Sequence, residues 1–340
     1  MGMVVRSAHL DADSQLIIDF LARNHTRDSN RERFDWLYRR CPAGLAQAWI
    51  SIDSATQSAV GIASAFPRRI YAFGEEKLGW VLGDFCIDPQ YRSLGPALQL
   101  QRACLAQFNT GQLAIYYDFP SATMVAVYQR LGVTLHAPMV RMAKPLRADR
   151  KVETLIRHSQ LARIVRSVIN AGLARRRRSS RLLDDSLVSA HQGLCGDEFT
   201  QLAQNVGRAA GVCLQRSADY LNWRYLDHPY RRHEIVTLRR SNCLLAYAVV
   251  REEDHNFDLL DLFGHQDAVT ELAREIIVIA ADRRLNAVTV EVLASHPWIK
   301  MFRRLGFYRR EKFPVVTHCS NGEIKEDDSS WLLMKGDRES

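Results

Sequence analysis

Three residues in the first third of the chain have the types and spacing that bind a diphosphate. Arg92, Gly95 and Ala97 lead into a stretch whose apolar residues recur at helical spacing. The first amides of a helix have no partner within it, and the aligned peptide dipoles add partial positive charge at that end. Gly95 leaves room for a ligand at the backbone, Ala97 keeps the first turn thin and Arg92 adds a cation. The spacing therefore predicts a site for linked phosphates at a helix N-terminus.

A strand before this site and a helix after it are predicted to position it. Trp80 to Ile87 is an apolar run of strand length, and Pro89 ends it because proline cannot donate to a sheet ladder. Pro96 stands where an early helical position tolerates proline. The apolar residues of the predicted helix are Leu98, Leu100, Ala103, Cys104 and Leu105.

The stretch from Ile87 to Ala97 resembles the acyl-CoA-binding motif of the GNAT superfamily of N-acetyltransferases. That motif has Arg or Gln, two residues, Gly, one residue, then Gly or Ala, and this chain matches it except for Pro96, which removes one amide. The alternative is an ordinary strand-turn-helix with an exposed arginine. The resemblance implies acetyl-CoA or another acyl-CoA as co-substrate, with the strand backbone orienting its pantetheine. The implied cofactor-binding residues are Phe85, Cys86, Ile87, Arg92, Ser93, Leu94, Gly95 and Ala97.

A second stretch, Ser121 to Val133, resembles another GNAT motif, in which a helix ends in Tyr, two residues, an apolar residue and Gly. Tyr128, Leu131 and Gly132 occupy those positions. When an amine attacks a thioester, the leaving thiolate must be protonated, and the resemblance implies that Tyr128 supplies that proton. The alternative is a tyrosine packed between helix and sheet.

Asp84, on the predicted strand, is the candidate for accepting a proton from the amine, directly or through water. A hydrogen-bonded structural carboxylate is the alternative for this residue. Asp88 and Asp118, near strand ends, are weaker candidates. The histidines of the second half have no metal-ligand spacing, so the sequence predicts no metal site.

The composition is that of a soluble globular protein. Hydrophobic residues make up 47% and charged residues 25% of 340 residues, enough for two domains. No segment approaches the length of a membrane-spanning helix, and the first residues lack the apolar core of a secretory signal. Seven cysteines without a Cys-x-x-Cys pair indicate buried thiols in a reducing compartment. We therefore predict a cytoplasmic protein.

The net charge of +8 is concentrated in one connecting segment. Twelve Lys or Arg and only two acids lie between Lys144 and Arg181. Val152 to Leu173 has an apolar stripe at helical spacing with arginines off it, and Arg175 to Arg178 follows. Such a helix either packs on a neighbouring domain or lies on an anionic membrane through residues 152–181. Nucleic acid is a weaker third alternative, because no aromatic residues interleave with the arginines.

Landmarks of the first half recur in the second. Trp36-Leu37-Tyr38-x-x-x-Pro42 matches Trp223-Arg224-Tyr225-x-x-x-Pro229, and Tyr128 to Val133 matches Phe302 to Phe307. This ordered recurrence predicts two copies of one fold. The second copy is predicted to be degenerate, because Leu259 to Leu272 has no Arg-x-x-Gly-x-Ala and Phe302 has no hydroxyl.

These observations predict an α/β protein with mixed sheets and two tandem GNAT-like domains. The predicted divisions are residues 1–145 for the first domain, 146–190 for a basic helical connector and 191–340 for the degenerate domain. The resemblance implies an acyl-CoA-dependent N-acyltransferase acting on a primary amine. Tandem proteins with this Trp-x-Tyr-x-x-x-Pro element resemble bacterial acyltransferases of polysaccharide or cell-envelope assembly, which implies an amino sugar as acceptor. The alternatives are a Fem-type transferase that uses aminoacyl-tRNA and a non-catalytic scaffold.

Overall fold

The computed structural model describes residues 2–108, 115–135, 137–147, 186–319 and 331–339. The predicted basic helix from Val152 to Leu173 and the run from Arg175 to Arg178 lie outside the described residues. In the described part of the chain, no helix is both long and apolar enough to cross a membrane.

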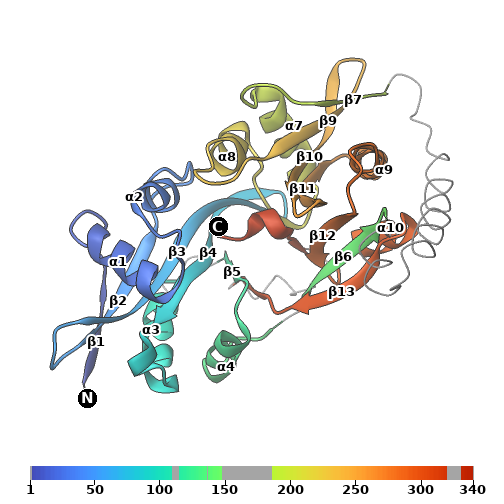
Figure 1. Cartoon of the computed structure of the whole chain (residues 1–340). Coiled ribbons are helices and arrows are strands. Elements are labelled where there is room, and N and C mark those ends of the chain that lie inside the picture. The colour runs from blue at the N-terminus through green and yellow to red at the C-terminus, as the bar shows by residue number, and fades with distance from the viewer. Residues whose placement is uncertain (1, 109–114, 136, 148–185, 320–330, 340) are drawn as a thin grey trace, which may run out of the picture.

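The first half follows the predicted order of a strand, two helices, two strands, and then the motif strand and the motif helix (Figure 1). Its elements are β1 (Met3–Ser7), α1 (Ser14–Asn24), α2 (Arg31–Phe34), the π-helix η1 (Asp35–Arg39), β2 (Gln47–Asp53), β3 (Ala59–Ala72), β4 (Glu75–Ile87), the 3-10 turn η2 (Pro89–Tyr91), α3 (Leu94–Ala106), β5 (Ile115–Asp118), α4 (Ala122–Arg130) and β6 (Met139–Pro145). Side-chain caps begin two of the helices, since Asn30 accepts the Arg33 amide and Ser121 accepts the Met124 amide.

The second half runs through a similar series of elements. These are β7 (Ser186–Ala190), α7 (Asp197–Gly207), β8 (Val212–Leu214), α8 (Ala218–Leu221), the π-helix η3 (Asn222–Leu226), β9 (Glu234–Arg240), β10 (Cys243–Glu253), β11 (Asn256–Gly264), α9 (Gln266–Asp282), β12 (Ala287–Leu293), α10 (Trp298–Arg304), β13 (Tyr308–Phe313), β14 (Val316–Cys319), β15 (Trp331–Leu332) and the 3-10 turn η5 (Lys335–Asp337). In both halves a one-turn α-helix leads directly into a π-helix, and a pair of antiparallel strands follows.

The two halves exchange strands. The first sheet has the order β1-β2-β3-β4-β5-β14, with β8 paired to β3 and β15 to β8. The second has the order β13-β6-β12-β11-β10-β9-β7. Each sheet is mixed, because β4 and β5 pair in parallel, as do β11 and β12, among antiparallel neighbours. This confirms the predicted α/β class.

This exchange crosses the divisions predicted from the sequence. β6, within the predicted first domain (1–145), lies in the second sheet, whereas β14, from the predicted second domain (191–340), completes the first. The predicted connector (146–190) ends in a strand, β7, which pairs with β9. Hydrophobic patterning does not show which sheet a strand joins, since a strand buried on both faces reads alike in either.

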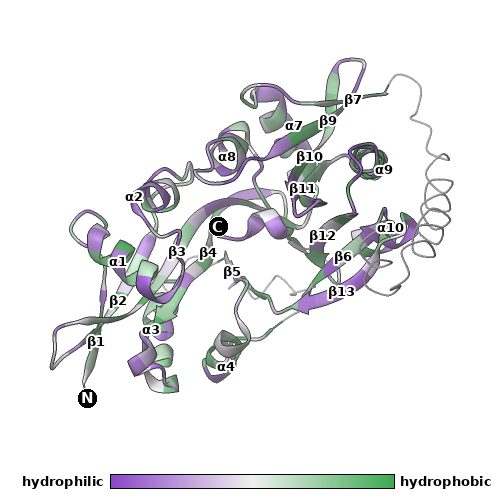
Figure 2. Ribbon diagram, in the orientation of Figure 1, coloured by the Kyte–Doolittle hydropathy of each residue, from purple (hydrophilic) through white to green (hydrophobic). Residues whose placement is uncertain are grey.

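The edge of the second sheet is protected by charge. β13 is an edge strand, and Figure 2 shows it as largely hydrophilic beside the more hydrophobic inner strands. Its residues Arg309 to Lys312 are exposed. Charged side chains on an edge strand disfavour pairing with a second molecule.

The repeated tryptophans form a reciprocal contact between the halves. Trp36 Nε1 donates to the backbone oxygen of Trp223 over 2.9 Å, and Trp223 Nε1 donates to that of Trp36 over 3.0 Å. Their rings stack with centroids 5.1 Å apart. Each tryptophan lies in a π-helix, a wide turn that is rare and that often marks a functional position.

A segment near residue 335 occupies the space between β11 and β12 in the second sheet. The parallel pairing of β11 and β12 ends at Leu259 and Val290. Beyond that point Met334 forms a bridge with Val292 of β12, and its sulfur accepts the amide of Leu262 of β11. The space between these two strands is therefore occupied by the chain itself, and η5 lies between the two sheets (Figure 1).

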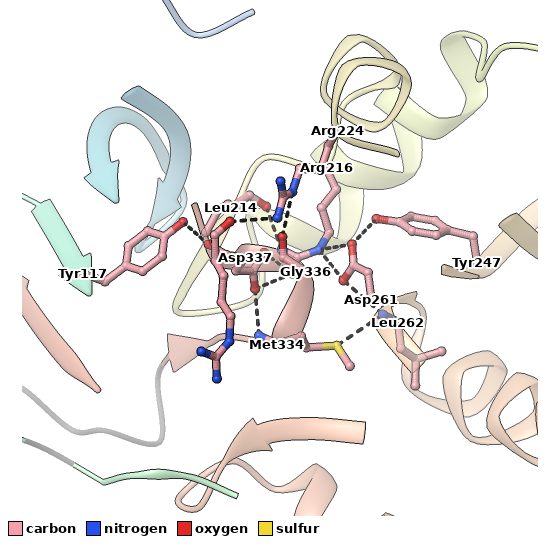
Figure 3. Close-up of polar contacts among 11 residues, drawn as sticks. Tyr117, Leu214, Arg216, Arg224, Tyr247, Asp261, Leu262, Met334, Gly336 and Asp337 are labelled. Carbon is pink, nitrogen blue, oxygen red and sulfur yellow. Dashed lines mark hydrogen bonds and ion pairs between the residues drawn. The ribbon is translucent and has the colours of Figure 1, made fainter. Parts of the chain in front are cut away.

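Arg216 fixes this segment. Its Nε donates to both oxygens of Asp261, at 2.9 and 3.0 Å, and its Nη2 donates to both oxygens of Asp337 at 3.0 Å (Figure 3). All three residues are fully buried. Tyr247 donates to Asp261, and the amide of Met334 donates to Asp337. Burial raises the pKa of Asp337 to about 6, and Arg216 opposes the shift.

Replacement of Arg216 by Met should destabilise the protein strongly. It leaves Asp261 and Asp337 buried without their cation, which we expect to lower the free energy of unfolding by about 3 to 5 kcal/mol. Urea denaturation followed by tryptophan fluorescence measures the change. As a control, Arg283→Met removes a solvent-exposed ion pair with Glu234 and should cost less than about 1 kcal/mol. Equal losses in the two variants would contradict a structural role for the buried cluster.

Candidate functional site

A cavity of about 680 Å³ lies where β4 and β5 separate. The two strands pair in parallel at Trp80–Tyr116 and Val81–Tyr117. β4 then continues, and each residue from Leu82 to Ile87 lines the cavity. The edge of β4 that faces away from β3 is therefore turned toward an open space, whereas the corresponding space in the second sheet is filled by Met334.

Asp84 lies in a bulge of β4. Pairing with β3 passes from Ile62–Cys86 to Ser64–Gly83, so β4 has one residue more than its partner. Asp84 takes a positive φ of 46°, which few residues other than glycine adopt. Bulges of this kind redirect a side chain and are common beside functional sites.

The Asp84 carboxylate is held by several hydrogen bonds. Arg33 donates to its two oxygens at 2.9 and 2.7 Å, and the Tyr38 hydroxyl donates at 2.8 Å. His25 Nε2 lies 3.6 Å from it. Burial, the largest single effect, would raise the pKa of Asp84, but the charge and hydrogen bonds of Arg33, with smaller contributions from His25 and Tyr38, together lower the pKa. Asp84 is therefore an ionised group with little tendency to take up a proton.

The start of α3 is the second part of the site. Its N-cap, Ser93, makes no side-chain hydrogen bond to the first turn. A Cβ added at Gly95 would meet no atom within 4 Å, so the backbone there faces open space. Arg92 is exposed and its Nε donates to the carbonyl of Ile87 over 3.1 Å, which leaves its other nitrogens available. The entrance to the helix is thus accessible to an anion.

Tyr128 is linked to the cavity through Asp118 and Gln101. Its hydroxyl is fully buried, donates to Asp118 over 2.6 Å and accepts from Gln101 over 3.2 Å. Asp118 and Gln101 line the cavity, whereas Tyr128 is not among the lining residues. Burial raises the pKa of Asp118 to about 7, although the bond from Tyr128 opposes this. Burial and the neighbouring Asp118 raise the pKa of Tyr128 as well.

Glu339 is a cavity residue that the sequence analysis missed. It lines the cavity beside β4, where a Cβ added at Gly83 would lie 2.5 Å from its Cγ. Burial, with Asp84 as the largest charge effect, raises the pKa of Glu339. Glu339 follows η5, so its position depends on the Arg216 cluster. No sequence pattern signals this approach, because it joins residues about 250 positions apart.

The predicted cofactor residues converge on this cavity. Its lining includes Phe85, Cys86, Ile87, Arg92, Ser93, Leu94 and Ala97, as well as Asp84. Gly95 lies in the first turn of α3, beside the cavity. Asp88, the weaker candidate for the proton acceptor, is not among the lining residues, and its carboxylate accepts the amide of Gln90. Within the described ranges, no group of three or more His, Cys, Asp or Glu residues could hold a metal ion.

Comparison with solved structures places this geometry in a known fold. A GCN5-related N-acetyltransferase from Anabaena variabilis superposes with a TM-score of 0.65 at 12% identity, over 93% of this chain and 72% of that one. A probable N-acyltransferase of unknown function from Enterococcus faecalis gives 0.63 at 11% identity, over 94% and 71%. The fold is that of the GCN5-related N-acetyltransferases.

The likeness also extends to N-myristoyltransferase. The Saccharomyces cerevisiae enzyme, solved with bound myristoyl-CoA, superposes with a TM-score of 0.54 at 13% identity, over 94% of this chain and 79% of that one. The matches take in both sheets, since they cover more than nine-tenths of the chain. A scan against family models and a search of curated proteins both find no match. At these identities the GNAT likeness is one of fold.

Replacement of Tyr128 by Phe should raise the pKa of Asp118 above its value of about 7. The hydroxyl stabilises the ionised carboxylate, so its loss favours the protonated form. Isotope-edited infrared titration of labelled aspartates measures this. Tyr117→Phe is the matched control, because the buried Tyr117 donates to the backbone of Asp337 instead. An unchanged Asp118 titration in Tyr128→Phe would show that the two side chains are not coupled.

Proposed function

We propose that this protein transfers an acetyl or other short acyl group from acyl-CoA to a primary amine. The observation that carries the proposal is the cavity between β4 and β5, which runs beside the accessible start of α3. An extended chain with amide groups, such as pantetheine, can hydrogen-bond to the open edge of β4 as an added strand would. Its pyrophosphate then meets the first amides of α3 and the side chain of Arg92.

The residues present suit direct transfer to the amine. The amine nitrogen bonds to the thioester carbon, the carbon–sulfur bond breaks, and CoA leaves as a thiolate. Cys86 lines the cavity, but burial raises the pKa of its thiol, so it is a poor nucleophile for a covalent intermediate. A single direct step requires one group to take a proton from the amine and another to give one to the thiolate.

Two carboxylates are candidates for the proton acceptor. Asp84, the residue predicted from the sequence, is held ionised by Arg33 and is therefore a weak base. Glu339 has a raised pKa and lies beside Asp84 in the same cavity. We assign proton acceptance to Glu339. In this arrangement Asp84 attracts the cationic amine and raises the basicity of Glu339 by charge repulsion.

Asp118 and Tyr128 are the pair that protonates the thiolate. Asp118 faces the cavity, and with a pKa of about 7 a large fraction is protonated near neutral pH. Tyr128 orients it and is the second member of the hydrogen-bonded pair. The sequence analysis gave protonation of the thiolate to Tyr128 alone. We give it to the pair, in which Asp118 contacts the substrate.

The finer assignments rest on the sequence alone. An amino sugar of polysaccharide or envelope assembly is the acceptor implied by the Trp-x-Tyr-x-x-x-Pro resemblance. A cytoplasmic location and contact of residues 152–181 with an anionic membrane stay predictions.

Arg92→Glu tests the co-substrate. We expect the affinity for acetyl-CoA to fall about 10- to 100-fold, because a charge-assisted bond to phosphate is replaced by repulsion. Isothermal titration measures the affinity, and circular dichroism checks that the fold persists. Arg102→Glu, the same change at an exposed position farther along α3, should leave binding unchanged. Failure of the unsubstituted protein to bind acetyl-CoA would exclude the proposed function.

Glu339→Gln tests the assigned base. We expect kcat to fall about 100-fold or more while acetyl-CoA affinity is retained. In the unsubstituted protein, kcat/KM should fall as the pH drops through the raised pKa of Glu339, and again as Asp118 loses its proton above about pH 7. The Gln variant should lose only the acidic limb. Thiol release over a pH series records both limbs, and Glu311→Gln, an exposed carboxylate on β13, is the control. If the acidic limb of the kcat/KM profile persists in Glu339→Gln, a group other than Glu339 accepts the proton from the amine.

A further inference from the structure

A second, small cavity lies at the contact between the halves. It has a volume of about 80 Å³, roughly the space of two or three water molecules. Residues from the first half that line it include His25, Arg33 and Trp36, and those from the second half include His228 and Arg231. A cavity of this size accepts a single functional group and not a whole substrate.

This small cavity adjoins the larger cavity between β4 and β5. His25 lines both, and its Nε2 lies 3.6 Å from Asp84. Arg33 lines the small cavity and also donates both of its Nη atoms to Asp84. His25 and Arg33 therefore belong to the wall of the small cavity and also contact Asp84, which lines the larger cavity.

The small cavity is lined by one arginine whose charge is not held in an ion pair in the described part of the chain. Arg231 is exposed and, within the described residues, makes no hydrogen bond or ion pair. The charges of Arg224 and Arg251 act on Arg231, and each of these two residues has one buried nitrogen without a hydrogen-bond partner among the described residues. Burial together with Arg251 lowers the pKa of Arg231, so its own charge is poorly compensated. Asp28 also lines the cavity. The other nearby acids are paired elsewhere, Asp84 with Arg33 and both Glu253 and Asp258 with Arg251.

Two histidines near the small cavity have lowered pKa values. Burial, with Arg224 as the largest charge effect, lowers the pKa of His228 to about 3. His233, behind it, is lowered to about 4 by burial and by the same arginines. His228 Nδ1 accepts the amide of Tyr230, so the proton of the neutral ring is on Nε2 and is available to an acceptor. Its ring lies 4.6 Å from that of Trp36.

We propose that this small cavity binds an anionic group of the amine acceptor, a carboxylate or a phosphate monoester, with Arg231 as its charged partner. The inference rests on the proposed function, because the amine end must reach Asp84 and Glu339. It assigns the acceptor to short primary amines that carry an anion, and it gives the second half of the chain a part in choosing the substrate.

Matched amines test this inference. O-phosphoethanolamine is compared with ethanolamine, and β-alanine with 3-amino-1-propanol, by isothermal titration of the full chain with and without CoA. We expect at least one anionic compound to bind about tenfold or more tightly than its neutral partner. The compound that gains more identifies phosphate or carboxylate as the group recognised. Equal affinities within both pairs would overturn the proposal.

Two single substitutions separate this site from general surface charge. Arg231→Gln should weaken the anionic compound about 10- to 100-fold and leave its neutral partner unchanged. Arg232→Gln removes an equal charge from the next residue, which does not line the cavity, and should have little effect. Equal losses in the two variants would indicate a nonspecific field and overturn the proposal. Titration with acetyl-CoA alone tests the proposed function separately, because Arg231 lies outside the cavity that would hold it.

Discussion

One buried guanidinium holds the whole arrangement together. Arg216 binds Asp261 of β11 and Asp337 of η5, and all three side chains are excluded from water. Two carboxylates with one cation make a poorly neutralised cluster, so the ion pairs by themselves are weak evidence of stability. They nevertheless fix one position for η5, because any other position would leave a buried charge without its partner. The residues that follow η5 are thereby directed into the cavity of the first sheet.

In each sheet two parallel strands move apart, but the space between them is open in the first sheet and filled in the second. Between β4 and β5 it is a cavity, whereas between β11 and β12 Met334 and the turn after it fill the space. β11 also passes into α9 through the single residue His265, so nothing corresponds to the loop around Arg92. The second half is best understood as a support for the first. It adds β14 to the end of the first sheet, contributes Glu339 to the large cavity and lines part of the small one.

The sequence predicted local features better than long-range ones. The strand ending at Ile87, the helix with Pro96 in its first turn and the cap at Ser121 follow from local chemistry, and all are present. The exchange of β6 and β14 was not predictable, because periodicity shows that a strand is buried but not which neighbour buries it. Glu339 was missed for a similar reason, since its position depends on a cluster formed by three distant residues. The repeated Trp-x-Tyr pattern predicted a repeat and gave no sign of π-helices or of a reciprocal contact.

The carboxyl groups of the site have different pKa values because their surroundings differ, and the proposed chemistry depends on this difference. Asp84 and Asp118 line the same cavity, but Arg33 keeps the first ionised, while burial raises the pKa of the second to about 7 against the opposing hydrogen bond from Tyr128. Carboxyl groups with separated pKa values can divide acid and base roles within one cavity. Glu339 lines the same cavity, and burial together with the Asp84 charge raises its pKa. The strained backbone at Asp84 is consistent with this division, because the carboxylate in the bulge bonds to Arg33 and Tyr38 and still lies at the cavity wall.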